Sequence, residues 1–149
     1  MSHYEFMSQA LLLAKKAEKH CDVPVGAVIV CNGKIIAEGQ NKREKDNNSL
    51  LHAEISAINE ACRVKNSKYL SDCTLYVTLE PCPMCAGAII NSRIEKVVFG
   101  AYDDKAGCFG TLTNFNDLSF NHKPQITGGY MEKECSEIIS EFFRKNRQK

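Results

Sequence analysis

Residues 74–91, TLYVTLEPCPMCAGAIIN, decide the fold of this chain. The first six of them alternate and are rich in β-branched residues, which predicts a strand over Thr74–Leu79. Pro83 is well placed as the first residue of a helix, where its missing N–H costs nothing, and we expect a helix over Pro81–Asn91. A strand that passes directly into a helix is typical of α/β folds, in which helices pack on a buried sheet.

The flanking sequence continues this alternation. The apolar run Val25–Cys31 is joined to Lys34–Gly39 by Asn32-Gly33, which is the strongest short signal for a β-hairpin. Other segments have helical or strand-like apolar spacing, and we expect helices over Tyr4–Ala17, His52–Val64 and Cys135–Phe143 and strands over Lys96–Ala101 and Gln125–Thr127. The length suits one core, so the sequence predicts a single domain over residues 1–149, with helices packed on a mixed sheet.

The composition excludes a strongly basic protein that binds nucleic acid through its overall charge. The net charge is +1, so a nucleic acid could bind only where basic side chains gather on one face. The chain shows neither a signal-peptide pattern nor an apolar run long enough for a membrane span, and we expect a cytoplasmic protein with no membrane partner. Its eight cysteines are then reduced, and serve as metal ligands or as small buried side chains.

Cys82 and Cys85 are the first candidate metal ligands. We expect Cys82 at the N-cap of the helix that Pro83 starts, and Cys85 in its first turn. The exposed N–H groups and partial positive charge of a helix N-terminus favour thiolates, which are the form that binds metal. The spacing lets both sulfurs reach one point. Taken alone, the pair could also be a redox Cys-x-x-Cys motif or two buried structural cysteines.

His52 completes a ligand set of the softness that suits zinc. Three protein ligands leave a coordination position for water and indicate a catalytic site, whereas structural sites use four. Any of four further cysteines could close the site, but none has a partner at ligand spacing: Cys31, Cys62, Cys73 and Cys108. We therefore favour an open zinc site held by His52, Cys82 and Cys85.

Glu54 is the candidate proton carrier. It follows His52 by two positions, which in mid-helix would place the side chains ~200° apart. The two can serve one metal only if the metal lies beyond the end of the helix, where side chains of the first turn converge. A carboxylate beside a zinc site can take a proton from water and return it elsewhere. The alternative is a glutamate on an exposed helix surface.

Together these residues resemble a known family. His-x-Glu followed by Pro-Cys-x-x-Cys is an established signature of zinc-dependent base and nucleoside deaminases. The similarity to the bacterial tRNA-specific adenosine deaminases extends from about Phe6 to Arg147. It is carried by Pro24–Val28, Asn41, His52–Ile55, Thr74–Ile89, Val97–Ala101, Gly107 and Gly110, Asn121-His122 and Phe142–Arg144.

The resemblance implies a three-layer cytidine-deaminase-like fold, with a five-stranded mixed sheet and helices on both faces. It implies one Zn²⁺ per subunit, a homodimer, and hydrolysis of the wobble adenosine in a tRNA anticodon stem-loop to inosine, with Glu54 as the proton shuttle. By position, the nucleoside would be bound by Val25, Asn41 and Ala53, and the RNA would lie near Asp103, Lys105, Asn121, Phe143 and Arg144.

Two loops depart from the family pattern. Residues 47–51 read NNSLL where the family usually carries Asp and a Pro, Ala or Thr, and residues 107–110 are bulkier than the small residues usual there. Both loops are expected near the substrate, so their effect on substrate preference is open.

Two other functions stay open from the residues alone. The same zinc chemistry serves deaminases of free guanine or cytosine bases or nucleosides. A zinc-stabilised RNA-binding module or inactive partner subunit is the non-enzymatic alternative, although such a protein has no use for Glu54. The aromatic and basic residues 142–147 favour RNA, by stacking and by phosphate contacts, if they are not part of the core.

Overall fold

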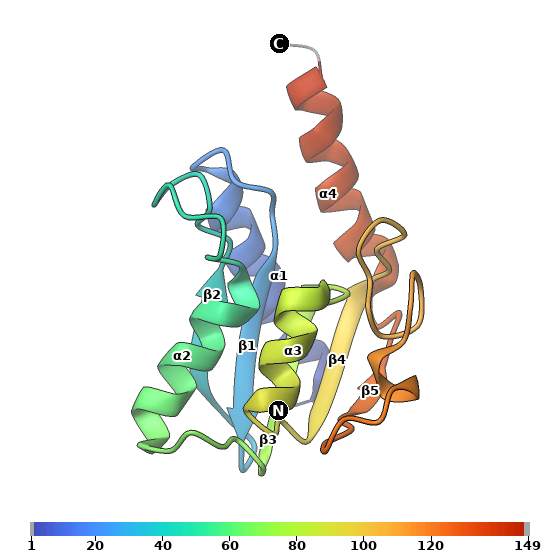
Figure 1. Cartoon of the computed structure of the whole chain (residues 1–149). Coiled ribbons are helices and arrows are strands. Elements are labelled where there is room, and N and C mark those ends of the chain that lie inside the picture. Colours follow the sequence, from blue (N-terminus) through green and yellow to red (C-terminus); the bar gives the residue numbers. More distant parts are fainter. Residues whose placement is uncertain (1, 148–149) are drawn as a thin grey trace.

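The computed structural model describes residues 2–147. The single-domain prediction also covers Met1, Gln148 and Lys149, which lie outside the described residues. In chain order the elements are α1 (His3–Glu18), β1 (Gly26–Cys31), β2 (Lys34–Gln40), α2 (Ala53–Lys65), β3 (Cys73–Leu79), α3 (Pro83–Asn91), β4 (Lys96–Ala101), the short 3₁₀ helix η1 (Phe115–Asp117), β5 (Gln125–Thr127) and α4 (Glu132–Arg147) (Figure 1).

The five strands form one mixed sheet in the order β2-β1-β3-β4-β5. β1 pairs antiparallel with β2 and β3, whereas β3, β4 and β5 run parallel. The predicted hairpin is present: Asn32 and Gly33 both have positive φ, at 53° and 76°, which is the backbone that a two-residue hairpin turn requires. The predicted five-stranded mixed sheet is confirmed.

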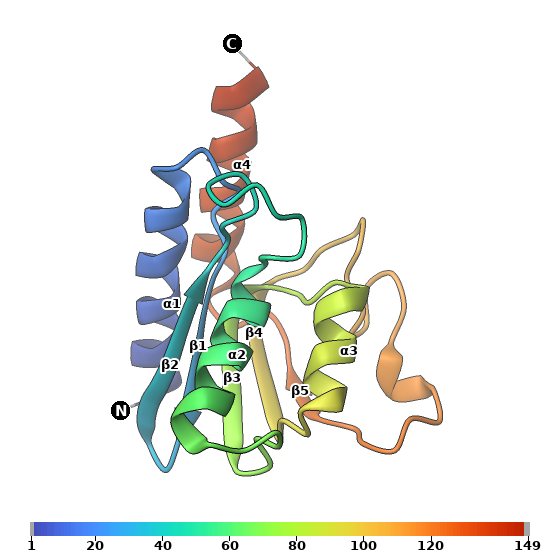
Figure 2. The ribbon, with the colours of Figure 1, turned by 60° about the vertical axis from the view of Figure 1, so that its left-hand side comes forward.

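Helices cover both faces of the sheet (Figure 2). Alternate residues of β1 point to opposite faces. Ala27 and Ile29 pack with α2 and α3, while Val28 packs with α1, where Met7 is fully buried. The chain thus has two apolar cores on either side of one sheet, which is the predicted three-layer arrangement.

The boundaries of all four helices differ from the expectation, by one residue at each end of α1 and α2 and by more in α3 and α4. α3 begins at Pro83 rather than Pro81, because Cys82 has extended backbone and serves as the N-cap. α4 is longer than the predicted 135–143, because polar turns continue the helix beyond its apolar stripe. The 3₁₀ helix η1 lies in a stretch for which no element was expected.

Gly39 lets β2 and α2 pack in backbone contact. A Cβ at this position would overlap the Ala53 carbonyl oxygen and lie 2.7 Å from the Ala57 nitrogen. Because backbone cannot rotate away, we expect Gly39→Ala to lower the free energy of unfolding by about 1–3 kcal/mol or more, measured by urea denaturation. Gly87→Ala is the matched control, since no atom lies within 4 Å of a Cβ there and alanine is favoured in a helix. Equal stability of the two variants would contradict this packing.

Within residues 2–147, every helix is too short or too polar to span a lipid bilayer.

Candidate metal centre

Two helices, α2 and α3, begin at the same end of the sheet (Figure 2). Their first residues bring the predicted ligands together. His52 is the N-cap of α2 and Cys82 is the N-cap of α3, and neither side chain caps its own helix. Both side chains are therefore available for another partner. Cys85, in the first turn of α3, is fully buried beside them.

The spacing of the three ligand atoms fits a tetrahedral zinc ion. The Nδ1 atom of His52 lies 3.6 Å from the Cys82 sulfur and 3.5 Å from the Cys85 sulfur. Zinc bonds of ~2.3 Å to sulfur and ~2.0 Å to nitrogen, at a tetrahedral angle, would set these atoms ~3.5 Å apart. The donor types and their separations both suit zinc, and the three atoms form one of the groups of potential metal ligands in the described chain.

The two sulfurs differ in acidity. The hydrogen bond from the Cys85 thiol, followed by that from His52, lowers the pKa of Cys82 to about 4. The same bond to Cys82, together with burial, raises the pKa of Cys85. The hydrogen bond to Cys82 also raises the pKa of His52. Cys82 is thus a thiolate at neutral pH, and a divalent ion at this point would displace the remaining proton.

Glu54 lies in the first turn of α2 and is buried, with 4% of its surface exposed. Burial raises the pKa of its carboxyl group to about 7, and the Cys85 thiol hydrogen-bonds to the carboxylate. The expected convergence of His52 and Glu54 beyond the helix end is therefore present. A group with a pKa near neutrality can both accept and return a proton at physiological pH.

A cavity of about 500 Å³ opens onto this cluster. Its walls come from segments that are distant in sequence, namely the segment before β1, the loop after β2, the starts of α2 and α3, the ends of β3 and β4, the loop after β4, and α4. Most of the predicted site residues line it: Val25, Asn41, His52, Ala53, Glu54, Cys82, Asp103, Lys105 and Phe143.

Two predicted RNA contacts do not line the cavity. Asn121 is exposed in the segment before β5, next to His122, whose ring hydrogen-bonds to the carbonyl of Ile94 beyond the opposite end of the sheet. Arg144 is exposed on α4 and pairs with Glu141 at 2.5 Å. The adjacent aromatic residues are divided: Phe142 is buried at 8% exposure, whereas Phe143 is 45% exposed and faces the cavity.

Glu80 is a buried carboxylate that sequence reasoning did not single out. It accepts hydrogen bonds from the backbone N–H groups of Asp103 (3.1 Å) and Phe109 (3.1 Å) and from both donors of Thr111. A Cβ on Gly107 would overlap this carboxylate. Glu80 thus holds the loop that carries Asp103 and Lys105 against the cavity. The sequence did offer a signal for Glu80, because an acidic residue directly follows a strand predicted to be buried.

Asp22 holds a second loop in place in the same way, on the other side of the cavity. It is 1% exposed and accepts hydrogen bonds from the N–H groups of Glu44 (2.6 Å) and Lys45 (3.2 Å). Asn41, at the start of this loop, donates to the Val23 carbonyl (3.2 Å) and accepts from the Arg43 N–H (3.1 Å). Two buried carboxylates therefore fix the loops that flank the site.

The unusual residues of the second atypical loop point away from the cavity. Cys108 and Phe109 are 1% and 5% exposed and belong to the core under α2 and α3. Their bulk is accommodated in the core. The first atypical loop, 47–51, is largely exposed and lies outside the cavity lining as well.

Comparison with known families matches this arrangement. Residues 1–101 match the family model described as the cytidine and deoxycytidylate deaminase zinc-binding region. The chain belongs to this deaminase family. Zinc is therefore the cofactor of this deaminase, in agreement with the His52, Cys82 and Cys85 geometry.

Curated relatives place this deaminase among the tRNA-specific adenosine deaminases. A protein of that name from Bacillus subtilis is 52% identical over 97% of this chain and 90% of its own length. One from Aquifex aeolicus is 48% identical over 95% of this chain and 94% of its own. Both alignments include all the residues of the metal centre, because they span nearly the whole of each protein.

Two solved structures are similar in fold and in sequence. One, from a study of A-to-I editing by tRNA:A34 deaminases at the wobble position of transfer RNA, superposes with a TM-score of 0.86 at 38% identity, covering 91% of this deaminase and 99% of that chain. A guanine deaminase from Bacillus subtilis superposes with a TM-score of 0.66 at 45% identity, covering 68% and 66%. The cytidine-deaminase-like fold is thereby confirmed.

Proposed function

We propose that this deaminase hydrolyses the wobble adenosine of a tRNA anticodon loop to inosine, with release of ammonia. The observation that carries the reaction is the buried Glu54 carboxyl, which lines the cavity together with His52 and Cys82, next to the buried Cys85. The substrate follows from the relatives, which are named for this activity and align over nearly the whole chain.

In this proposal His52, Cys82 and Cys85 hold one zinc ion per subunit. Zinc supplies Lewis-acid chemistry, which lowers the pKa of a bound water towards neutrality. Two thiolates and one imidazole would hold the ion with three protein ligands, the number typical of catalytic zinc sites. No side chain besides these three joins the ligand group in the described chain, which supports an open, catalytic site.

Glu54 moves the protons. It accepts one from the attacking water and donates one to the ring nitrogen next to C6, and the amino group leaves as ammonia after a further proton transfer. Its raised pKa of about 7 suits both directions of transfer, because neither protonation state is strongly favoured. Burial also keeps the carboxyl away from bulk water, so its protons go to the substrate.

Val25, Asn41 and Ala53 form the pocket for the base. Val25 and Ala53 are buried apolar residues in the cavity wall, against which a purine can pack. The amide of Asn41 is fixed by its bonds to Val23 and Arg43, so it presents a preset orientation to the nucleoside. An adenine can enter such a pocket only when it is unstacked, which costs less in a loop than in a duplex.

The RNA contacts and the assembly belong to the same proposal. Lys105 and Phe143 stand at the cavity mouth, where a cation and an aromatic ring can meet phosphate and a flanking base. Asp103, Arg144 and Asn121 are proposed to contact the RNA around Lys105 and Phe143. Asn121 lies far from the cavity of its own chain, which suits a homodimer with an RNA site built from both subunits. The substrate class implies a cytoplasmic protein.

An anticodon stem-loop with adenosine at the wobble position tests the substrate. We expect the zinc-loaded protein to convert that adenosine to inosine, detected by mass spectrometry of digested RNA. Because phosphate contacts release counterions, KM should rise steeply with salt while turnover of bound RNA changes little. Phe143→Ala should raise KM for the stem-loop by roughly tenfold, since base–aromatic stacking contributes about 1–3 kcal/mol.

The control is the same loop with guanosine at the wobble position. Free guanine, cytosine and their nucleosides are tested in parallel, because the guanine deaminase of Bacillus subtilis shares 45% identity with the aligned part of this chain. Ammonia released from a free base at a higher kcat/KM than from the stem-loop would replace the tRNA proposal with that alternative.

A further inference from the structure

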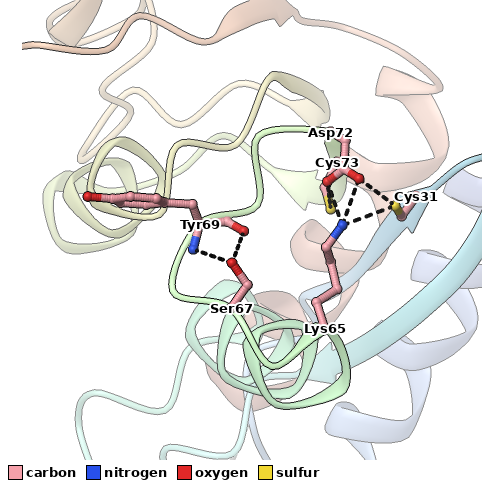
Figure 3. Close-up of polar contacts among 6 residues, drawn as sticks. All are labelled: Cys31, Lys65, Ser67, Tyr69, Asp72 and Cys73. Atoms are coloured by element: carbon pink, nitrogen blue, oxygen red, sulfur yellow. Dashed lines mark hydrogen bonds and ion pairs between the residues drawn. The ribbon is translucent and has the colours of Figure 1, made fainter.

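Figure 3 shows a second cluster of potential metal ligands. It lies at the C-terminal end of α2, whereas His52 lies at the N-terminal end. Cys31 ends β1, while Asp72 and Cys73 mark the start of β3. Lys65 is the last residue of α2. α2 has 13 residues, so ~20 Å of helix separates this cluster from His52.

The sheet places the two thiols side by side. Cys31 and Cys73 are directly opposite each other in the antiparallel pairing of β1 and β3. The Cys73 N–H donates to the Leu70 carbonyl and its carbonyl accepts from the Glu95 N–H, so the backbone of Cys73 is turned away from β1. Such non-hydrogen-bonded pairs hold their side chains closest together on one face of a sheet.

Asp72 adds a carboxylate at metal-ligand distance from both sulfurs. The Cys31 sulfur lies 3.3 Å from Oδ2 of Asp72, and the Cys73 sulfur lies 3.5 Å from Oδ1. A tetrahedral zinc ion with bonds of ~2.3 Å to sulfur and ~2.0 Å to oxygen would separate these atoms by ~3.5 Å. The catalytic ligands show the same spacing, at 3.5 and 3.6 Å.

The position between these ligands already attracts a cation. The Lys65 ammonium lies 2.7 Å from both carboxylate oxygens of Asp72 and 3.5 Å from the Cys31 sulfur (Figure 3). Lys65 and Asp72 keep 24% and 53% of their side-chain surface exposed, so the ammonium has a route to solvent. The loop that carries Asp72 is ordered by the hydrogen bonds between Ser67 and Tyr69, at 2.9 and 3.1 Å.

We propose that Cys31, Cys73 and Asp72 form a second binding site for a thiophilic divalent cation of the zinc and cadmium type. The Lys65 ammonium lies against these ligands in the absence of the cation and moves away when the cation binds. Two sulfurs and one carboxylate suit zinc and cadmium better than the hard ions magnesium and calcium. The ion would fasten the end of β1 to the start of β3, away from the substrate cavity.

Binding at this site has to displace protons. Burial is the main cause that raises the pKa of Cys73 to about 12, so at neutral pH this sulfur carries its proton until a metal replaces it. Lys65 stabilises the negative charge of Asp72 in the meantime.

The test counts metal ions per chain in the zinc-loaded protein, kept reduced with a phosphine and titrated with Zn²⁺ or Cd²⁺. Native mass spectrometry gives the stoichiometry, and sulfur-to-cadmium charge-transfer absorbance reports thiolate ligation. We expect wild type to bind a second ion. Cys31→Ser with Cys73→Ser should hold only one, with deaminase turnover unchanged. Lys65→Met should lower the Kd of the second ion by roughly tenfold to a hundredfold, because a competing positive charge is gone.

Two further variants identify the side chains that hold the second ion. Cys21→Ser with Cys62→Ser is the matched control, because these thiols lie outside both clusters, and it should retain the second ion. Asp72→Asn changes an exposed side chain, and it should weaken the second ion without loss of either thiol. A stoichiometry of one in both wild type and Lys65→Met, or a second ion that persists in the Cys31→Ser/Cys73→Ser variant, would overturn the proposal.

Discussion

Replacing Glu54 by alanine is expected to lower deaminase turnover by about 10²- to 10⁴-fold, the range that a positioned general acid–base group contributes, while the protein keeps its catalytic zinc. The reason is the geometry of the first turn of α2. Glu54 is buried and hydrogen-bonded to Cys85. Its carboxylate is nevertheless outside the group of ligand atoms formed by His52, Cys82 and Cys85. Its removal should therefore affect proton transfer and leave the metal in place.

The measurement pairs inosine formation under single-turnover conditions with zinc content by elemental analysis. Glu60→Ala is the control, because Glu60 lies on the same helix but is 41% exposed and paired only with Arg63. We expect Glu60→Ala to match wild type in both readouts. A Glu54→Ala protein with at least a tenth of the wild-type rate would remove Glu54 from the mechanism.

Glu54→Gln adds a test that separates chemistry from stability. A buried carboxylate is costly to desolvate, and burial raises its pKa to about 7 for that reason. The amide is neutral and of similar size, so the variant should be inactive but unfold at the same temperature as wild type or higher. A large drop in Tm would instead indicate that Glu54 serves the fold.

Cys82→Ser and His52→Ala are expected to lose both the catalytic zinc and activity. Each change leaves two of three ligands, and the proposed water activation disappears with the metal, so turnover should fall by roughly 10³-fold or more. Serine is a poor replacement because the lowered pKa of about 4 makes Cys82 a thiolate, whereas a serine hydroxyl stays protonated.

Removal and return of zinc check the same prediction on unaltered protein. A chelator should abolish inosine formation in wild type, and added Zn²⁺ should restore it. Cys62→Ser is the matched cysteine control, since Cys62 is half-buried on α2 away from the ligands. Full activity in a protein shown to contain no zinc would exclude the proposed role of the metal.

The chemistry of neighbouring residues predicted much of the local structure of this protein. Asn32-Gly33 predicted the hairpin because few residues adopt positive φ in both turn positions. Pro83 predicted the start of α3 and thereby placed Cys82 at the N-cap. Cys82 and Cys85 were recognisable as candidate metal ligands because they share one helix start, so their spacing in sequence fixes their spacing in space.

Long-range packing decided the rest. Asp22 and Glu80 are ordinary acidic residues in the sequence, and only the fold buries them and aims neighbouring loop N–H groups at their carboxylates. Phe142 and Phe143 are adjacent and chemically identical, yet the rotation of one helix residue sends one into the protein and the other to the cavity.

The sequence by itself determined the hairpin, the N-cap position of Cys82 and the Cys82–Cys85 pair, because each depends on residues a few positions apart. The His-x-Glu and Pro-Cys-x-x-Cys motifs added His52 as a candidate ligand and indicated the fold class by resemblance. Only the tertiary structure decided what strand pairing brings together. Cys31 and Cys73 have no partner at ligand spacing along the chain, but antiparallel pairing sets them opposite each other, and the loop before β3 adds Asp72. Spacing along the chain fixes the relative positions of residues that are close in sequence. Strand pairing brings together residues that are far apart in sequence, and their spacing along the chain does not reveal it.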